Sequence, residues 1–321
     1  MFRALMFTLA LSTAASADVA ETLKDHILPG YAQFTATTTA LADAADATCD
    51  PATLRPAFQA GYDAWMAVQH LRLGPVEVDG RGLAISFWPD PKGQGAKAQR
   101  QLLAGDPAQL APDMFAQQSV AARGLTGLER LLYPEEALPG TCPLIRATAR
   151  DLARMAAEVN AGWTGGYAQT MLTAGEPGNT TYLTRPEPRQ ALFTQIVTGL
   201  EFTLDQRLAR PLGTFTKPRP ERAEARASGR SLRNVTLSLA ALRAMAASLT
   251  PDAPLTMAAF DRALAQAAAL NDPVFAGVTD PQQRLKLEIL RQSLQSLRAV
   301  VTTELARELD VGIGFNAADG D

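Results

Sequence analysis

Histidine and cysteine are scarce in this chain, which has two of each among its 321 residues. A metal site needs several deprotonated ligands that converge on one ion, and His26 and His70 are the only imidazoles. A zinc protease usually carries two histidines one helical turn apart with a glutamate between them, and no such pair occurs. A Gly-x-Ser-x-Gly nucleophile elbow is missing too. The sequence therefore argues against hydrolytic activity.

The chain also lacks strand patterns, long apolar runs and a large charge of one sign. Alternating polarity is absent, and alanine and leucine recur at helical spacing, which predicts an all-α protein. No later apolar run approaches the roughly 20 residues that a transmembrane helix needs. The net charge is -3, so no basic field exists to attract nucleic acid.

The N-terminus has the pattern of a secretory signal peptide over residues 1–17. Arg3 precedes a short apolar run, and Ala15, Ser16 and Ala17 form a small-residue cleavage site. We expect cleavage after Ala17 and a soluble, periplasmic mature chain. No cysteine follows the cleavage site, so a lipid anchor there is not indicated.

Cys49 and Cys142 are the only cysteines, and both belong to the exported part. An oxidising compartment favours a disulfide between them over two free thiols. Their use as a metal thiolate pair would need a further cysteine or histidine close by, and the sequence offers none.

Helical periodicity and turn signals divide the mature chain into two predicted helical bundles. A segment rich in glycine, proline and threonine, 175–189, separates an N-terminal bundle at 18–180 from a C-terminal bundle at 181–321. The predicted helices are 32–46, 51–71, 107–133 with a break at Pro112, 143–163, 190–209, 231–249, 256–270 and 281–309. His26 is expected at the entry to the first helix.

The stretch 123–133 carries one glutamate among leucines and glycines. Gly124, Thr126 and Glu129 follow the spacing of a Gly-x-His-x-x-Glu motif in which Thr126 replaces the histidine. Further blocks lie at 65–75, 87–90, 228–234 and 314–321. In these blocks the chain resembles the imelysin-like family, and within it the predicted periplasmic lipoprotein and iron-regulated branch.

The resemblance implies a two-domain all-α fold with the functional site in a cleft between the bundles. It also implies an iron-related periplasmic function, with peptidase activity attached to the family by name. On the residues of this chain, the cleft would be built from Thr126, Glu129, His70, Arg72, Trp88 and Asp90, with Arg230 and Asn316 opposite.

The metal chemistry of this site depends on Thr126 and Glu129, which share a helix face. A threonine hydroxyl is a poor ligand for a divalent transition metal, whereas Glu129 could ligate through oxygen. Alternatively, Glu129 is a buried carboxylate satisfied by an arginine. His70 is either a ligand or substrate contact, or a core or capping residue near a helix C-terminus that favours its imidazolium form.

Two further segments bear on the ligand. Trp88, Pro89 and Asp90 join an aromatic ring to a carboxylate in a predicted loop. Four arginines, if helical, form one stripe that needs anions to neutralise it: Arg222, Arg226, Arg230 and Arg233. The anion is an external ligand or, as we favour, the acidic tail with Asp310, Asp319 and Asp321.

The sequence therefore predicts a non-catalytic periplasmic binding protein linked to iron acquisition. With Thr126 in place of histidine, we expect weak affinity for bare ferrous ion and a small anion or metal chelate as ligand. Iron itself, through Glu129 and His70, remains a possible cofactor. The alternatives are a metallopeptidase and an interaction module that docks a protein of an iron or haem system.

Overall fold

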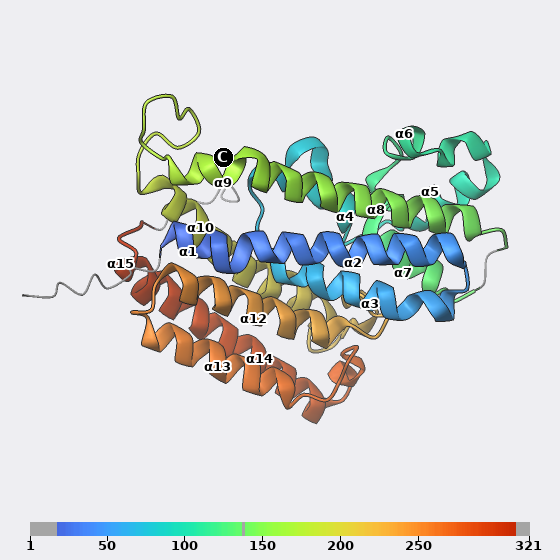
Figure 1. Ribbon diagram of the computed structural model, residues 1–321. Helices are drawn as coiled ribbons and strands as arrows, with labels where there is room; N and C mark the ends of the chain where they lie inside the picture. The colour runs from blue at the N-terminus through green and yellow to red at the C-terminus, as the bar shows by residue number, and fades with distance from the viewer. Residues whose placement is uncertain (1–17, 137–138, 313–321) are drawn as a thin grey trace, which may run out of the picture.

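The computed structural model of the protein describes residues 18–136 and 139–312, and these residues fold into helices and connecting turns (Figure 1). Within these two ranges the only β-pairing is an isolated bridge between Thr214 and Lys217, so the all-α prediction is confirmed. None of the helices in the same ranges is both long and apolar enough to cross a bilayer. The signal peptide and the acidic tail predicted from sequence lie outside the described residues.

Four long helices are interrupted by π-helical turns, which divide them into separately numbered parts. The first half contains α1 (Val19–Thr22), α2 (Leu28–Ala47), α3 (Pro51–Val68), α4 (Arg81–Ile85), α5 (Gln94–Ala104), α6 (Pro112–Phe115), α7 (Gly124–Leu132), α8 (Cys142–Gly162) and α9 (Ala168–Leu172). The second half contains α10 (Glu187–Phe202), α11 (Ala209–Leu212), α12 (Ser231–Leu249), α13 (Pro254–Ala268), α14 (Pro281–Val300) and α15 (Ala306–Glu308). The π-helical turns are η1 (Leu23–Ile27), η6 (Trp163–Tyr167), η7 (Thr203–Leu208) and η10 (Val301–Leu305).

Most long helices begin and end near the predicted residues because their capping signals are local. Asp50 accepts a hydrogen bond from the Thr53 backbone N–H at 2.9 Å, and Pro51 occupies the first helical position of α3. Asp280 caps α14 in the same way, accepting from the N–H groups of Gln282 and Gln283. The predicted range 231–249 is the full extent of α12.

The prediction of one helix over 107–133 with a single break is wrong. That region forms short helical pieces, and only the nine residues of α7 make the last one. Arg123 is extended at φ -98° and ψ -179°, and Gly124 has φ +62°, a value that interrupts any helix.

The prediction that His26 precedes the first helix is also wrong. Helix α1 begins at Val19, and His26 lies inside η1, which joins α1 to α2. In this turn the Leu28 N–H donates to the Leu23 carbonyl, one residue farther back than in an α-helix. Pro29, which has no N–H of its own to donate, follows directly, so the helix passes the proline instead of starting after it.

The core is one connected cluster of buried apolar side chains drawn from both halves of the chain. Helix α2 packs against α3 and α8, α3 packs against α12, and α12 packs against α13, which covers α14 (Figure 1). Fully buried Trp65 on α3 lies 5.2 Å from Phe34 on α2, centroid to centroid. The first half therefore meets the second mainly through the contact of α3 with α12.

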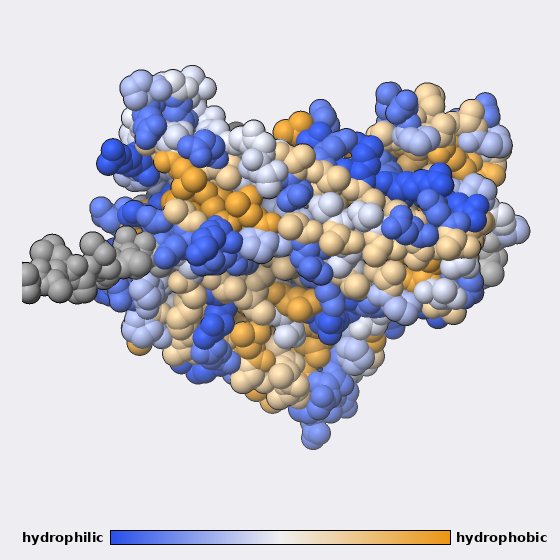
Figure 2. Space-filling view, viewed as in Figure 1, coloured by the Kyte–Doolittle hydropathy of each residue, from blue (hydrophilic) through white to orange (hydrophobic). Residues whose placement is uncertain are grey.

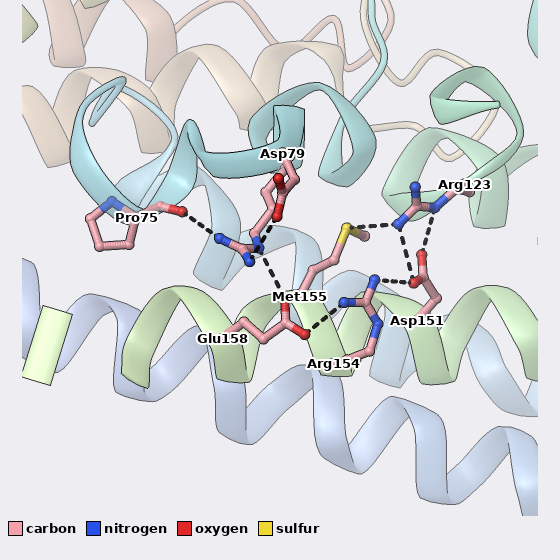
Figure 3. Close-up of polar contacts among 8 residues, drawn as sticks. Pro75, Asp79, Arg123, Asp151, Arg154, Met155 and Glu158 are labelled. Carbon is pink, nitrogen blue, oxygen red and sulfur yellow. Dashed lines mark hydrogen bonds and ion pairs between the residues drawn. The ribbon is translucent and has the colours of Figure 1, made fainter. Parts of the chain in front are cut away.

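Buried ion pairs fix the start of α7 against α8 (Figure 3). Arg123 donates to Asp151 at 2.8 and 3.2 Å, and the two side chains are 8% and 3% exposed. Arg154 reaches the same carboxylate and also pairs with Glu158. Glu158 in turn binds Arg81 at the start of α4. These contacts hold α4 and α7 on the same side of α8.

Cys49 and Cys142 form the predicted disulfide, with their Cα atoms 5.3 Å apart. It joins the α2–α3 connection to the first residue of α8 across 93 positions of sequence. On the entropic model, a loop of this length restricts the unfolded chain by roughly 4–5 kcal/mol.

We expect Gly124→Ala to be much more destabilising than Gly93→Ala, although both glycines have φ +62°. A Cβ at position 124 would lie 2.1 Å from the Ala84 carbonyl oxygen and 2.3 Å from that of Ile85. A Cβ at position 93 would have no neighbouring atom within 4 Å. Both variants carry the left-handed backbone cost of about 1–2 kcal/mol, and overpacking adds about 1–3 kcal/mol at position 124 alone. Urea unfolding of both variants measures the difference, and equal losses would contradict the contact geometry.

Candidate functional site

A cavity of about 260 Å³ is lined by residues from both halves of the chain. His70, Arg72 and Trp88 of the first half line it, together with Phe202 and Arg207 of the second. Three of the eight residues predicted for the cleft therefore share one cavity. The elements that position them are the end of α3, the segment after α4, and the junction of α10 with η7.

Arg72 contributes a positive charge that is not paired at this cavity. Its Nε donates to the Gln69 carbonyl oxygen at 3.1 Å, and its backbone N–H donates to Gln195 at 2.8 Å. No carboxylate of residues 18–136 or 139–312 forms an ion pair with its guanidinium. Burial, and secondarily the neighbouring Arg207, lowers the pKa of Arg72 from its ordinary value. Glu224 and Glu77 act on the guanidinium from a distance, and neither forms an ion pair with it.

Arg207, by contrast, is fully compensated. Its side chain is 2% exposed and pairs at 2.6 Å with Glu224, which is 1% exposed. It also donates to Thr203 and Ser238 at 3.2 and 3.1 Å and to Gln69. A buried charge with this many partners keeps its geometry without a ligand.

Trp88 supplies an aromatic wall. Its ring lies 6.0 Å from that of Phe202 in an edge-to-face arrangement, and the Arg210 guanidinium lies 5.7 Å from its centroid. The Trp88–Pro89 peptide bond is cis. An aromatic surface beside a guanidinium suits a flat ligand that carries negative charge.

Thr126 and Asp90 support the Trp88 segment and do not line the cavity. The Thr126 hydroxyl accepts a hydrogen bond from the Phe87 N–H at 3.2 Å. Asp90 accepts from the N–H groups of Gln94 and Gly95 at 2.9 and 2.8 Å, so it caps α5. The sequence reading placed both residues in the cleft, whereas their contacts hold the loop that carries Trp88.

Glu129 is a buried carboxylate, but the arginine we considered as its partner is not there. It accepts two hydrogen bonds from Ser228, from the backbone N–H at 2.9 Å and the hydroxyl at 2.7 Å. In the described part of the chain no arginine forms an ion pair with it. Burial raises the pKa of Glu129, and the bonds from Ser228 oppose this only in part.

The predicted arginine stripe does not form, because residues 223–229 are not helical. Arg230 and Arg233 both pair with Asp63 on α3, so the neutralising anion comes from the other half of the chain. Asp310 makes no ion pair within the ranges that the structure describes. Asp319, Asp321 and the predicted cleft residue Asn316 lie outside those ranges.

A buried chain of hydrogen bonds connects Arg207 at the cavity to Glu129. It runs in the order Arg207, Glu224, Asn234, Arg230, Gln59, Ser228 and Glu129. Arg230 is 1% exposed and donates to the backbone oxygen of Gln59 at 3.3 Å. Sequence reasoning missed Gln59, Asp63, Arg207, Glu224 and Asn234. Arg207 gave no distinctive signal, because Glu201, Asp205 and Arg210 are charged residues close to it in the sequence.

The two histidines lie together. His26 Nε2 and His70 Nε2 are 3.2 Å apart, and His70 Nε2 is 3.1 Å from the Met245 sulfur. Burial lowers the pKa of His26 to about 4 and that of His70 well below its usual range. This corrects the expectation that a helix C-terminus favours the His70 imidazolium, since desolvation outweighs it.

No group of three or more histidine, cysteine, aspartate or glutamate side chains suited to a metal ion occurs among the residues that the structure describes. A second hollow, of about 430 Å³, lies beside α6 and α8. Arg150 pairs with Asp46 and Arg154 with Asp151, whereas Arg146 donates to the backbone carbonyls of Ala45 and Asp46. Figure 2 shows hydrophilic side chains over this part of α8. The smaller cavity is the better candidate site, because it joins Arg72 to the Trp88 ring and is lined by both halves of the chain.

Comparison with known proteins agrees with this fold. The sequence profile of the imelysin peptidase family matches residues 27–301. An imelysin-like protein from Psychrobacter arcticum superposes with a TM-score of 0.78 at 20% identity, covering 94% of this chain and 98% of the other. A putative iron-regulated protein A precursor from Parabacteroides distasonis gives 0.70 at 14% identity, with 89% and 94% covered. No curated protein sequence matches the chain.

We expect Glu129→Gln to gain stability relative to the wild type as the pH rises. A carboxyl group whose pKa is raised by folding holds its proton longer in the folded than in the unfolded state, so ionisation costs stability. The gain should be absent below the ordinary carboxyl pKa, grow from there to the raised pKa, and then stay constant. Unfolding titrations of both proteins from pH 4 upward measure it. A loss of stability in the variant over that window would mean that Ser228 favours the carboxylate.

Proposed function

The chain belongs to the imelysin family, and we propose that it is a non-catalytic periplasmic protein that binds a small anionic molecule or a metal chelate. The proposed site is the cavity lined by His70, Arg72 and Trp88. The observation that carries this proposal is the Arg72 guanidinium, which lines the cavity without a carboxylate partner. A link to iron acquisition is supported by the similarity to a protein described as iron-regulated.

The charge at the cavity favours an anion. Glu224 neutralises Arg207, so Arg72 leaves a net positive charge in a cavity lined by uncharged polar and apolar side chains. A guanidinium binds a carboxylate through two parallel hydrogen bonds, and partial burial strengthens that interaction. The volume of about 260 Å³ lies just below the usual range for drug-sized ligands, which fits a small carboxylate.

The signature residues are engaged in other contacts. The Thr126 hydroxyl binds the Phe87 N–H, and the Glu129 carboxylate binds Ser228. Both hydrogen bonds from Ser228 go to Glu129 Oε1, so Oε2 is the carboxylate oxygen left for a ferrous ion, and no cluster of further ligands accompanies it among the described residues. Weak affinity for the free ion is therefore part of the proposal.

The proposal includes the division into bundles at 18–180 and 181–321, with the cavity between them. In the described part of the chain, no cluster of metal-ligating side chains supports the metallopeptidase alternative. The interaction-module alternative needed an available arginine stripe, and Arg230 and Arg233 are occupied by Asp63. It would be supported if a periplasmic partner bound through other surfaces.

We predict that the exported chain begins at Asp18. The apolar run and small residues of 1–17 are those of a cleavable signal, and the Asp18 side chain caps α1 by accepting from the Ala20 N–H. Intact mass measurement of the protein from a periplasmic fraction tests this. Retention of residues 1–17 in that fraction would contradict it.

We expect calorimetry to detect binding of citrate or ferric citrate but little binding of ferrous ion alone. Arg72→Gln should weaken the carboxylate binding by roughly tenfold or more, since a charge-assisted pair contributes about 1.5–3 kcal/mol. Arg150→Gln is the matched control, because that arginine is exposed and pairs with Asp46 away from the cavity. Tight ferrous binding lost in Glu129→Ala, or citrate binding unchanged in Arg72→Gln, would overturn the proposal.

A further inference from the structure

We propose that His26, His70 and Met245 form a binding site for copper(I) next to the carboxylate cavity, with which it shares only His70. The site joins η1, the end of α3 and α12, three segments that are distant in sequence. It contains both imidazoles of the chain. Its third member, Met245, contributes a thioether sulfur.

The distances suit a metal ion. In zinc sites a ligating imidazole nitrogen lies about 2.0–2.1 Å from the ion and sulfur about 2.3 Å. An ion at such distances from two nitrogens 3.2 Å apart subtends an angle of about 100°, close to tetrahedral. The 3.1 Å separation between His70 Nε2 and the Met245 sulfur corresponds to about 90°. Each of these two separations, both of which involve His70 Nε2, is therefore compatible with a shared ion.

The contacts themselves are only partly explained by hydrogen bonding. His70 Nε2 lies within 3.2 Å of two atoms that both carry lone pairs, the His26 nitrogen and the Met245 sulfur. One N–H can serve only one of these contacts, whichever ring donates. A metal ion would accept electron pairs from all three atoms together.

The ligand set favours copper(I) over divalent ions. Thioether sulfur is a soft ligand that selects copper(I), and imidazole accepts copper as well. All three ligands are neutral, and the charged neighbour that acts on His70 is the cation Arg207. A buried divalent charge would be uncompensated here, whereas a monovalent ion carries a much smaller desolvation cost. His26 is only partly buried, so the ion has a route from solvent.

The test is a competition for copper(I) between the purified mature protein and bicinchoninate. Ascorbate should be the reductant, because thiol reductants would open the Cys49–Cys142 disulfide and create thiolate ligands. The wild type should take up one copper(I) per chain. Met245→Leu keeps the volume and the His26–His70 contact but removes the sulfur, and should weaken binding by roughly tenfold to a hundredfold. His26→Gln should weaken it at least as much.

Two controls make the result specific. Met155→Leu replaces a buried methionine of α8 that contacts Arg123, and this variant should bind copper(I) like the wild type. Glu129→Gln should also leave it unchanged. X-ray absorption should show one sulfur neighbour in the wild type and none in Met245→Leu. The proposal would be overturned if the wild type retained no copper(I) or preferred zinc. It would also be overturned if Met245→Leu bound copper(I) as tightly as the wild type, or if Glu129→Gln lost copper(I).

The two sites can be separated. Citrate binding that fails while copper(I) binds would overturn the cavity proposal alone. The reverse outcome would overturn the copper site alone.

Discussion

The rest of the structure depends on one constraint: a charge buried among these helices costs stability unless an opposite charge or several dipoles surround it. Arg207 with Glu224 satisfies it inside the second half, and Arg123 with Asp151 satisfies it inside the first. Arg230 with Asp63 satisfies it across the two. Removing one partner of such a pair leaves an uncompensated buried charge, a loss of about 3–5 kcal/mol. These pairs therefore restrict how α12 can sit on α3.

Local and long-range determinants of helix ends explain how much of the fold could be predicted. Helices such as α3 and α12 were predicted nearly to the residue because local signals, a capping Asp50 or an apolar repeat, determine their ends. Residues 107–133 were misread because the break at Gly124 depends on the close approach of the Ala84 and Ile85 carbonyls. No local pattern reports that approach.

The candidate site was only partly predictable for a related reason. His70, Arg72 and Trp88 were found because they lie in blocks 65–75 and 87–90, where the chain resembles the imelysin-like family. The partners of Glu129 and Arg230 were not, since Ser228 and Asp63 are 99 and 167 residues away from them. The signature stretch consequently identifies the family and supports the Trp88 loop, while the unpaired charge lies at Arg72.

The π-helical turns account for the polar residues that periodicity missed. One added residue rotates everything that follows by about 100° around the helix axis. A side chain inside such a turn can then face inward without disturbing the apolar faces on either side. His26 lies in η1 and Arg207 in η7, and each is directed to a buried polar partner in this way. Such turns occur frequently at functional sites.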